Sequence, residues 1–310
     1  MQARIYKSTG SWYTVKNENG QGFSARIKGI FKIDQITSTN PIAVGDMVNI
    51  EPEIGAENTA VITEICERKN YMARSSPHSR KHHHIIASNL DQVLLIATLK
   101  EPKTSQGFID RCFVAAEAYH IPPIIVFNKT DLYKKKEWEN FEKLKNIYQS
   151  IGYPVYDISM KTLEGVEAIK QLLENKITLF FGHSGVGKST LINYIIPEVE
   201  LSTKEVSGWS GKGVHTTTFA EMFDLSPAGE GKIIDTPGLR EFAITDIERP
   251  ELSHYFPEMR ERVPHCKFNN CLHIEEPGCA VKEAVEEGKI YMERYISYYN
   301  ILETIPENDY

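Results

Sequence analysis

Gly182-His183-Ser184-Gly185-Val186-Gly187-Lys188-Ser189 is the stretch of this chain that decides the fold prediction. It lies between an apolar run, residues 177–181, and a helix-prone segment, residues 190–196. Two glycines, a lysine and a serine at this spacing are typical of a loop whose backbone N–H groups cradle phosphates. We therefore predict that nucleotide phosphates contact Gly182, His183, Ser184, Gly185, Val186, Gly187, Lys188, Ser189 and Thr190.

Two side chains of this loop have defined chemical roles. The ammonium group of Lys188 reaches the β- and γ-phosphates, where it can stabilise charge during phosphoryl transfer, so it is a catalytic candidate. The hydroxyl of Ser189 coordinates the Mg²⁺ that accompanies the nucleotide. The pattern alone occurs by chance in some proteins, but the strand before it and the helix after it are what the mechanism requires.

A second motif, Asn128-Lys129-Thr130-Asp131, follows the apolar run 124–127 and indicates a guanine base. The carboxylate of Asp131 can accept both N–H groups on the Watson–Crick edge of guanine, whereas adenine would leave it unsatisfied. Asn128 can serve the O6/N7 side, and the stem of Lys129 can pack along the ring. Ser159, which follows the next predicted strand, is expected to complete the base pocket with its neighbours.

A third motif, Asp235-Thr236-Pro237-Gly238, supplies the remaining phosphate contacts. Asp235 is expected to hold Mg²⁺ through water, and the N–H of Gly238 to contact the γ-phosphate. Thr216-Thr217-Thr218 lies between the phosphate loop and this motif, and a hydroxyl there can join the Mg²⁺ shell only when the γ-phosphate is present. An ordinary β-strand is the alternative interpretation of the threonine triplet, but its position favours a switch.

The motifs stand in an unusual order. In Ras-type proteins the phosphate loop comes first and the guanine motif late, whereas here residues 128–131 precede residues 182–189. Strand-like runs at 92–97, 124–127, 155–158, 177–181 and 232–234 alternate with helical patterns between them. This alternation predicts a doubly wound α/β domain over residues 71–244, with the chemistry at the carboxyl ends of its strands. The order makes that domain a circularly permuted one.

One departure bears on the rate of hydrolysis. Leu239 follows Gly238, at the position where Ras-like enzymes have a water-orienting glutamine. An aliphatic side chain cannot orient water, so we expect slow intrinsic hydrolysis that a partner or another residue accelerates. His215 is the nearest candidate, and a solvated loop histidine is the alternative.

The first seventy residues predict a small β-barrel. Residues 11–15, 23–27, 44–50 and 60–65 are β-prone, and a turn signal at 19–22 joins the first two. About five strands at this spacing fit an OB-type barrel over residues 1–70, a fold that often binds oligonucleotides. Another kind of small β-barrel is the alternative.

Residues 245–310 predict a helical domain that holds a metal. Cys266, Cys271, His273 and Cys279 fit a closed, tetrahedral structural zinc site, with His265 as an alternate ligand. Helical patterns at 251–256, 280–287 and 290–301 surround them.

Charge and composition limit the possible partners and location. The net charge is −7, and residues 245–310 carry this whole excess, with fourteen acidic and seven basic side chains. This is not the footprint of a strongly basic RNA-binding protein, so any RNA contact must come from local patches. No run of about 18 apolar residues and no secretory signal is present, and five cysteines suit a reduced compartment. We expect a cytoplasmic protein without a membrane span.

An OB-like head, a permuted GTPase core and a Cys-x4-Cys-x-His-x5-Cys tail together resemble the ribosome small-subunit-dependent GTPases, the RsgA family, also called YjeQ or YloQ. The resemblance covers nearly the whole chain. It implies a bacterial cytoplasmic factor, expected to be a monomer, that binds the small (30S) ribosomal subunit and its 16S rRNA late in maturation. Its GTPase is expected to be slow alone and stimulated by the subunit.

The resemblance also assigns residues of the first switch. The histidine that matches His215 is implicated in hydrolysis, and the threonine that matches Thr217 is the switch threonine, which would share Mg²⁺ with Ser189 and Asp235. Val214 stands where the family often has an arginine, which weakens the expectation of a basic contact there.

Two other functions stay open at this point. The first is a regulatory GTP-binding module that signals to a protein partner without touching RNA. The second is a nucleic-acid-binding protein with a vestigial nucleotide site, against which the intact motif residues argue. A basic stretch where the barrel joins the core is a candidate phosphate-backbone patch or a solvated linker; it comprises Arg74, Arg80, Lys81, His82, His83 and His84.

Overall fold

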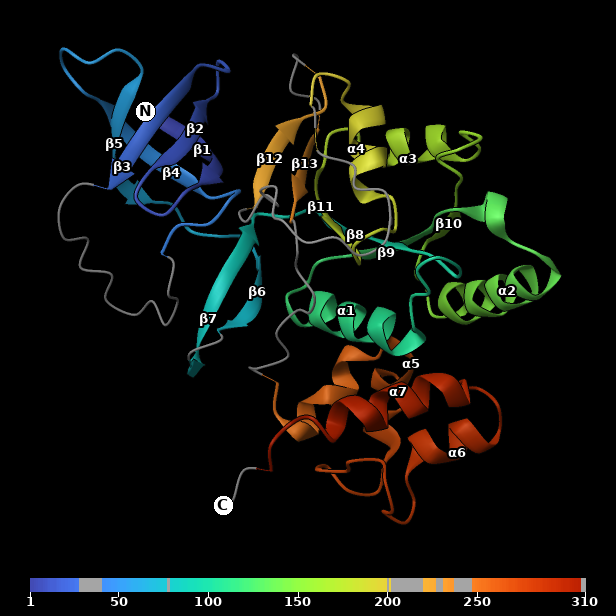
Figure 1. The fold of residues 1–310 in the computed structure, drawn as a ribbon. Coiled ribbons are helices and arrows are strands. Elements are labelled where there is room, and N and C mark those ends of the chain that lie inside the picture. Colours follow the sequence, from blue (N-terminus) through green and yellow to red (C-terminus); the bar gives the residue numbers. More distant parts are fainter. Residues whose placement is uncertain are drawn as a thin grey trace.

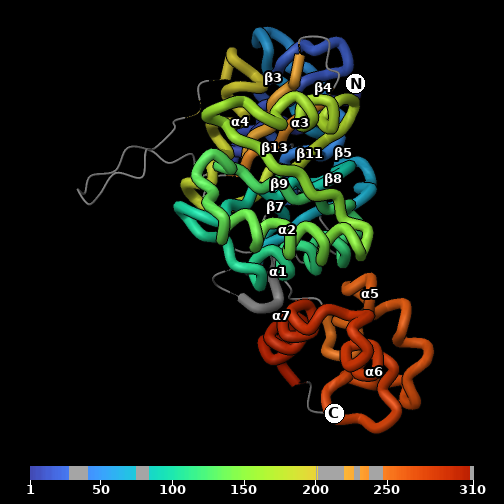
Figure 2. The backbone as a smooth tube through the Cα atoms, turned by 90° about the vertical axis from the view of Figure 1, so that its right-hand side faces the viewer, coloured from blue at the N-terminus to red at the C-terminus, as the bar shows by residue number. Residues whose placement is uncertain are grey.

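The computed structural model describes residues 1–27, 41–76, 79–199, 201, 220–226, 231–236 and 247–307, with the backbone alone for 75, 76 and 79–83. Figure 1 shows a β-barrel beside a sheet flanked by helices, with a helical cluster at the C-terminal end. In the side view of Figure 2 the barrel and the C-terminal helices lie at opposite ends, with the central sheet between them.

The barrel is built from five strands within the described residues: β1 (Gln2–Ser8), β2 (Tyr13–Asn17), β3 (Gly22–Ile27), β4 (Met47–Pro52) and β5 (Thr59–Ile65). They pair in the order β1-β2-β3-β5-β4, and β4 returns to β1, so the barrel is closed. The pair β3–β5 is parallel and the other pairs are antiparallel. This arrangement confirms the predicted OB-type barrel.

Strand β1 is not among the strands expected from the sequence, and its geometry explains why. Ile5 and Tyr6 are both buried, because the register shifts between Ile5 and Lys7 where β1 pairs with β2. A bulge of this kind breaks the inward–outward alternation by which a strand is recognised.

A hairpin follows the barrel, formed by β6 (Tyr71–Ser76) and β7 (Ser79–Ser88). Fully buried Asp46 ties it to the barrel, because its carboxylate accepts hydrogen bonds from Arg68 Nε at 2.7 Å and Ser88 Oγ at 2.5 Å. The basic stretch predicted as a patch or a linker therefore has a β-hairpin backbone. Its role as a phosphate contact stays a prediction.

The central sheet has the order β10-β9-β8-β11-β13-β12. Its strands are β8 (Gln92–Ala97), β9 (Pro123–Phe127), β10 (Val155–Asp157), β11 (Ile177–Phe181), β12 (Glu221–Asp224) and β13 (Lys232–Asp235). All neighbours are parallel except the pair β12–β13, so the carboxyl ends of five strands meet at one edge. Strand β12 was not predicted.

Helices cover both faces of this sheet (Figure 1). Helices α1 (Gln106–Ala118) and α2 (Lys135–Ser150) pack on one face through a cluster that includes Phe113 and Phe141. Helices α3 (Val166–Leu173) and α4 (Lys188–Ile195) pack on the other through Ile169 and Leu191. The doubly wound α/β prediction is confirmed.

The C-terminal part is helical, as expected. It comprises the 3₁₀ helices η2 (Arg249–Tyr255) and η3 (Val263–His265), with α5 (Pro257–Arg260), α6 (Ala280–Glu286) and α7 (Met292–Leu302). It packs on α1, and Val114 of that helix belongs to its apolar cluster. In the part of the chain that the structure describes, no helix is both long enough and apolar enough to cross a bilayer.

Candidate nucleotide and metal sites

The loop between β11 and α4 has the backbone that a phosphate cradle requires. Gly182, Gly185 and Gly187 have φ values of 153°, 84° and 97°, a region that side chains strongly disfavour. A Cβ on Gly182 would lie 2.4 Å from the carbonyl oxygen of Ile96 on the neighbouring strand β8. The first glycine therefore lets the loop turn closely over the sheet before α4 begins at Lys188.

The guanine motif lies directly against this loop. The side-chain amide of Asn128 donates a hydrogen bond from Nδ2 to the carbonyl oxygen of Val186 at 2.8 Å, across 58 positions of sequence. A Cβ on Gly187 would lie 2.2 Å from the same Nδ2 atom. Motifs that stand in permuted order along the chain are thus adjacent in space, because β9 and β11 are parallel strands that flank β8 and end at the same edge.

The rest of the base motif is held by the loop after β10. Ser159 Oγ donates to Asp131 Oδ1 at 2.8 Å and accepts the backbone N–H groups of Lys161 and Thr162 at 3.2 Å each. Thr130 Oγ1 donates to the carbonyl oxygen of Ile158 at 3.0 Å. These bonds fix the orientation of the Asp131 carboxylate, which is the group that would read the base.

Lys129 has a left-handed backbone, with φ at 66°. This conformation positions its side chain toward the loop after β8, where the ammonium group donates a hydrogen bond to the carbonyl oxygen of Glu101. Sequence reasoning did not assign that loop to the base pocket. The loop lies next to Lys129 because β8 pairs in parallel with β9, and no local sequence signal indicates that pairing.

Lys188 and Asp235 form an ion pair at the end of β13, with 11% and 8% of their side chains exposed. The ammonium group also approaches the carbonyl oxygen of Thr236 at 3.5 Å, and Thr236 Oγ1 donates to the carbonyl oxygen of Phe180 at 3.1 Å. The predicted phosphate lysine and the predicted magnesium carboxylate are therefore neighbours. Carboxylate and hydroxyl oxygens are donors that suit Mg²⁺.

The remaining loop residues differ in their surroundings. His183 stacks on Phe108 of α1, with ring centroids 3.7 Å apart. Ser189 is half-buried, whereas Ser184 and Thr190 are exposed. Phe108 was not predicted, since an apolar residue near the start of a helix carries no signal of a loop contact. His215, Thr217 and Gly238 lie outside the described residues, so their predicted roles are untested.

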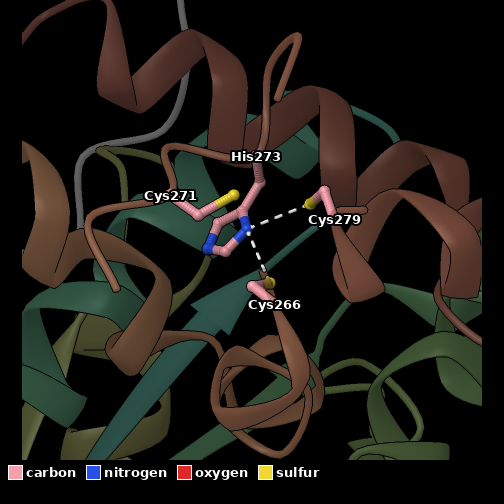
Figure 3. Close-up of side chains that lie close together, drawn as sticks. All are labelled: Cys266, Cys271, His273 and Cys279. Atoms are coloured by element: carbon pink, nitrogen blue, oxygen red, sulfur yellow. Dashed lines mark hydrogen bonds between the residues drawn. The ribbon is translucent and has the colours of Figure 1, made fainter. Parts of the chain in front are cut away.

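A separate cluster brings the four predicted metal ligands together (Figure 3). The ligand atoms of Cys266, Cys271, His273 and Cys279 all lie within 4.8 Å of one another. His273 Nδ1 lies 3.3 Å from Cys279 Sγ and 3.6 Å from Cys266 Sγ. Ligands at tetrahedral zinc bond lengths of about 2.1–2.3 Å are separated by roughly 3.5–4 Å, so these residues fit one such ion.

The lowered pKa of the histidine favours metal binding, whereas the raised pKa of the cysteine thiol must be offset by the metal itself. Burial lowers the pKa of His273, which favours the neutral, metal-binding form of the ring. Burial raises the pKa of the Cys271 thiol to about 12. Coordination to a metal ion lowers the pKa of a cysteine thiol, because the ion stabilises the thiolate.

Backbone contacts shape the ligand loop. The carboxylate of Glu276 accepts the N–H groups of Leu272 at 2.6 Å and Ile274 at 2.8 Å, one on each side of His273. Two tyrosines of α7, Tyr295 and Tyr298, donate to the carbonyl oxygens of His273 and Leu272. Neither feature was predicted; an acidic residue inside a cysteine–histidine cluster is the only signal that could have pointed to Glu276.

Comparisons with known proteins agree with this geometry. The family model for the RsgA GTPase matches residues 65–245, and the model for the RsgA N-terminal domain matches residues 2–62. The small ribosomal subunit biogenesis GTPase RsgA 2 of Bacteroides thetaiotaomicron is 51% identical over 310 residues, covering 100% of this chain and 99% of the relative. Its counterpart from Christiangramia forsetii is 50% identical over 309 residues, covering 99% and 98%.

Solved structures point the same way. The crystal structure of YjeQ from Thermotoga maritima has a TM-score of 0.80 and 33% identity and covers 99% of both chains. That of YloQ, described as a circularly permuted GTPase, has a TM-score of 0.75 and 32% identity and covers 100% of this chain and 96% of the other. From the permuted order of adjacent motifs, the match to more than half of the chain and the full-length relatives, we conclude that this chain belongs to the RsgA GTPase family.

Proposed function

We propose that this chain hydrolyses GTP to GDP and phosphate and acts in the late maturation of the small (30S) ribosomal subunit. The observation that carries the proposal is the hydrogen bond from Asn128 to Val186, because it joins a base-reading motif to a phosphate loop as one nucleotide pocket needs. The relatives named for small-subunit biogenesis support the cellular role. They do not favour the alternative of a regulatory module without RNA contact.

The roles proposed for individual residues follow from the contacts around the pocket. Asp131, oriented by Ser159, reads guanine, and the N–H groups of the phosphate loop hold the phosphates. Lys188 exchanges its bond to Asp235 for the β- and γ-phosphates when the nucleotide binds. Mg²⁺, which neutralises the developing phosphate charge, would be held by Ser189 and Asp235.

The switch residues complete this proposal. Thr217 would add a hydroxyl to the magnesium shell when the γ-phosphate is present, and Gly238 would contact that phosphate through its N–H. His215 would promote hydrolysis in place of the water-orienting glutamine that Leu239 replaces. These three assignments rest on the sequence resemblance.

The metal of the cysteine–histidine cluster is proposed to be zinc with a structural role. Three thiolates and one imidazole are the donors that zinc prefers, and four protein ligands leave no open position for catalysis. The ligand loop is held both by the carboxylate of Glu276 and by α7, so metal binding and the folding of this region are linked.

We further propose three domains and their environment. Residues 1–70 form an OB-type domain that contacts 16S rRNA, residues 71–244 form the GTPase domain, and residues 245–310 form the zinc domain. The protein would act as a monomer in the cytoplasm. Five free cysteines suit that reduced compartment.

The decisive experiment measures GTP hydrolysis with and without purified small ribosomal subunits. The wild-type chain should turn over GTP slowly by itself and faster when subunits are added. Lys188→Ala should lose both rates, because the phosphate charge then lacks its lysine. Equal rates of GTP hydrolysis by the wild-type chain and by Lys188→Ala would refute the enzymatic function. A wild-type rate that does not change when subunits are added would refute the ribosomal function.

A further inference from the structure

The barrel and the nucleotide site share one row of side chains. Lys7 at the end of β1 is the cross-strand partner of Glu221 on β12, and Glu221 is in turn the partner of Asp235 on β13. Both pairs are antiparallel, so the three side chains lie on one face of the sheet, with neighbouring Cβ atoms about 4.5–5.5 Å apart. Figure 1 shows β12 between the barrel and the rest of the sheet.

Two carboxylates, Glu221 and Asp235, stand side by side in this row, with a lysine at each end. Lys7 Nζ lies 2.6 Å from Glu221 Oε2, with the two side chains 33% and 27% exposed. Asp235 pairs on its other side with Lys188 of the phosphate loop. A carboxylate that belongs to neither the loop nor the base motif is thus next to the proposed magnesium carboxylate, and a lysine from the barrel neutralises it.

The barrel determines where this lysine lies. The first part of β1 pairs with β4 inside the barrel, through Gln2, Ala3 and Arg4. The bulge that follows Ile5 ends that part, and Lys7 is the residue that pairs with β12. Bulges bend a strand and redirect its side chains, so a movement of the barrel relative to β12 would change the bond from Lys7 to Glu221.

We propose that Lys7 and Glu221 are positioning residues for the magnesium edge of the nucleotide site, through which the position of the barrel sets magnesium-dependent nucleotide affinity. The inference rests on the proposed function, since it takes Asp235 as the carboxylate on the magnesium side. With Lys7 in place, the charge of Glu221 is balanced. When the barrel withdraws Lys7, the free carboxylate attracts the divalent ion and the nucleotide is held more tightly.

The size of the effect follows from Coulomb's law. Lys7 lies two cross-strand steps from Asp235, and a unit charge about 10 Å from a divalent ion, in a dielectric near that of water, changes the affinity for the ion by about fourfold. The measurement should be made at low ionic strength, because salt screens charges at this distance.

The test uses the full-length chain and the dissociation rate of a fluorescent GDP analogue as a function of free Mg²⁺. Lys7→Gln should lower the Mg²⁺ concentration that gives half-maximal slowing by about fourfold. Glu221→Gln should raise it, and the double variant Lys7→Gln/Glu221→Gln should return to the wild-type value. Thermal unfolding would check that each variant is folded.

Lys16→Gln is the matched control. Lys16 also crosses from the barrel to β12, but it bonds to Asp224 at 2.7 Å, about 10 Å further along the strand from the Asp235 row. It should leave the Mg²⁺ dependence unchanged. If Lys7→Gln also leaves it unchanged, or shifts it no more than Lys16→Gln does, the inference is wrong while the nucleotide site stands. If the wild-type chain binds no guanine nucleotide, both the proposed function and this inference are overturned.

Discussion

Replacing Arg294 with alanine tests what holds the C-terminal domain on the GTPase core. Arg294 lies on α7 and is only 1% exposed. Its guanidinium donates to Asp110 Oδ1 on α1 at 2.5 Å and to Glu258 Oε1 on α5 at 2.7 Å. Burial by itself lowers the pKa of Arg294, but the two carboxylates raise it well above its usual value, so the side chain stays charged.

The magnitude follows from what the substitution leaves behind. Asp110 is fully buried and Glu258 nearly so, and neither would keep its guanidinium partner. Breaking a buried ion pair by removing one partner costs about 3–5 kcal/mol, because an uncompensated charge remains in the interior. The guanidinium of Arg294 also lies over the ring of Phe256, with its central carbon 4.6 Å from the ring centroid. We therefore expect Arg294→Ala to destabilise this interface by about 3–5 kcal/mol.

Native-state hydrogen exchange of the α7 amides is the assay, since it reports the free energy of local opening. The expected loss of protection is roughly 10²- to 4 × 10³-fold, at about 1.4 kcal/mol for each factor of ten. Arg260→Ala is the control: Arg260 is 52% exposed and pairs with Glu117 at 3.4 Å, a surface contact worth about 0–1 kcal/mol. If Arg294→Ala reduced the protection of the α7 amides no more than Arg260→Ala does, the buried ion pairs of Arg294 would not hold this interface together.

Three further predictions concern the base pocket, the metal cluster and the barrel junction. Asp131→Asn should reduce the preference for GTP over ATP by roughly 1–3 kcal/mol, since a charged acceptor of two N–H groups is lost; competition binding that shows unchanged selectivity would contradict the pocket assignment. Cys271→Ser should release the metal and destabilise the C-terminal domain, whereas Cys66→Ser, outside the cluster, should keep one metal per chain. Metal content by atomic spectroscopy distinguishes these outcomes, and full retention in Cys271→Ser would refute the ligand set. Burial raises the pKa of Asp224, but hydrogen bonds from its lysine and tyrosine partners outweigh burial, and the folded pKa is lowered from 3.8. Its contribution to stability is therefore present above about pH 4 and lost as the pH falls through the folded value, so Asp224→Asn should flatten acid unfolding in that window. A variant with an unchanged acid-unfolding profile would show that this carboxylate does not contribute.

The motif residues and the strands that present them could be predicted from sequence because their signals are local. The apolar runs 92–97 and 177–181 coincide with β8 and β11, since a parallel strand buried on both faces needs consecutive apolar residues. The four candidate metal ligands could be predicted for a similar reason: their spacing within fourteen residues is itself the requirement for one ion.

Strands β1 and β12 escaped prediction because neither carries a clean period of two. The bulge after Ile5 interrupts the first, and the second is only four residues long, with a single fully buried side chain, Met222. The hairpin of β6 and β7 was missed because its polar stretch was taken as a possible linker, whereas its position is set by buried Asp46. Each of these elements is specified by partners distant in sequence.

The sequence by itself determined the candidate chemistry of this protein: a phosphate loop, a base motif, a proposed magnesium carboxylate and four candidate metal ligands, each encoded within a short stretch of chain. Only the tertiary structure decided how these parts meet. The contact of Asn128 with Val186, the row from Lys7 to Asp235 and the bonds from Arg294 to α1 and α5 all join residues far apart in the chain. Such contacts depend on strand register and helix packing, which arise from the burial of the whole core. A short stretch of sequence does not predict them.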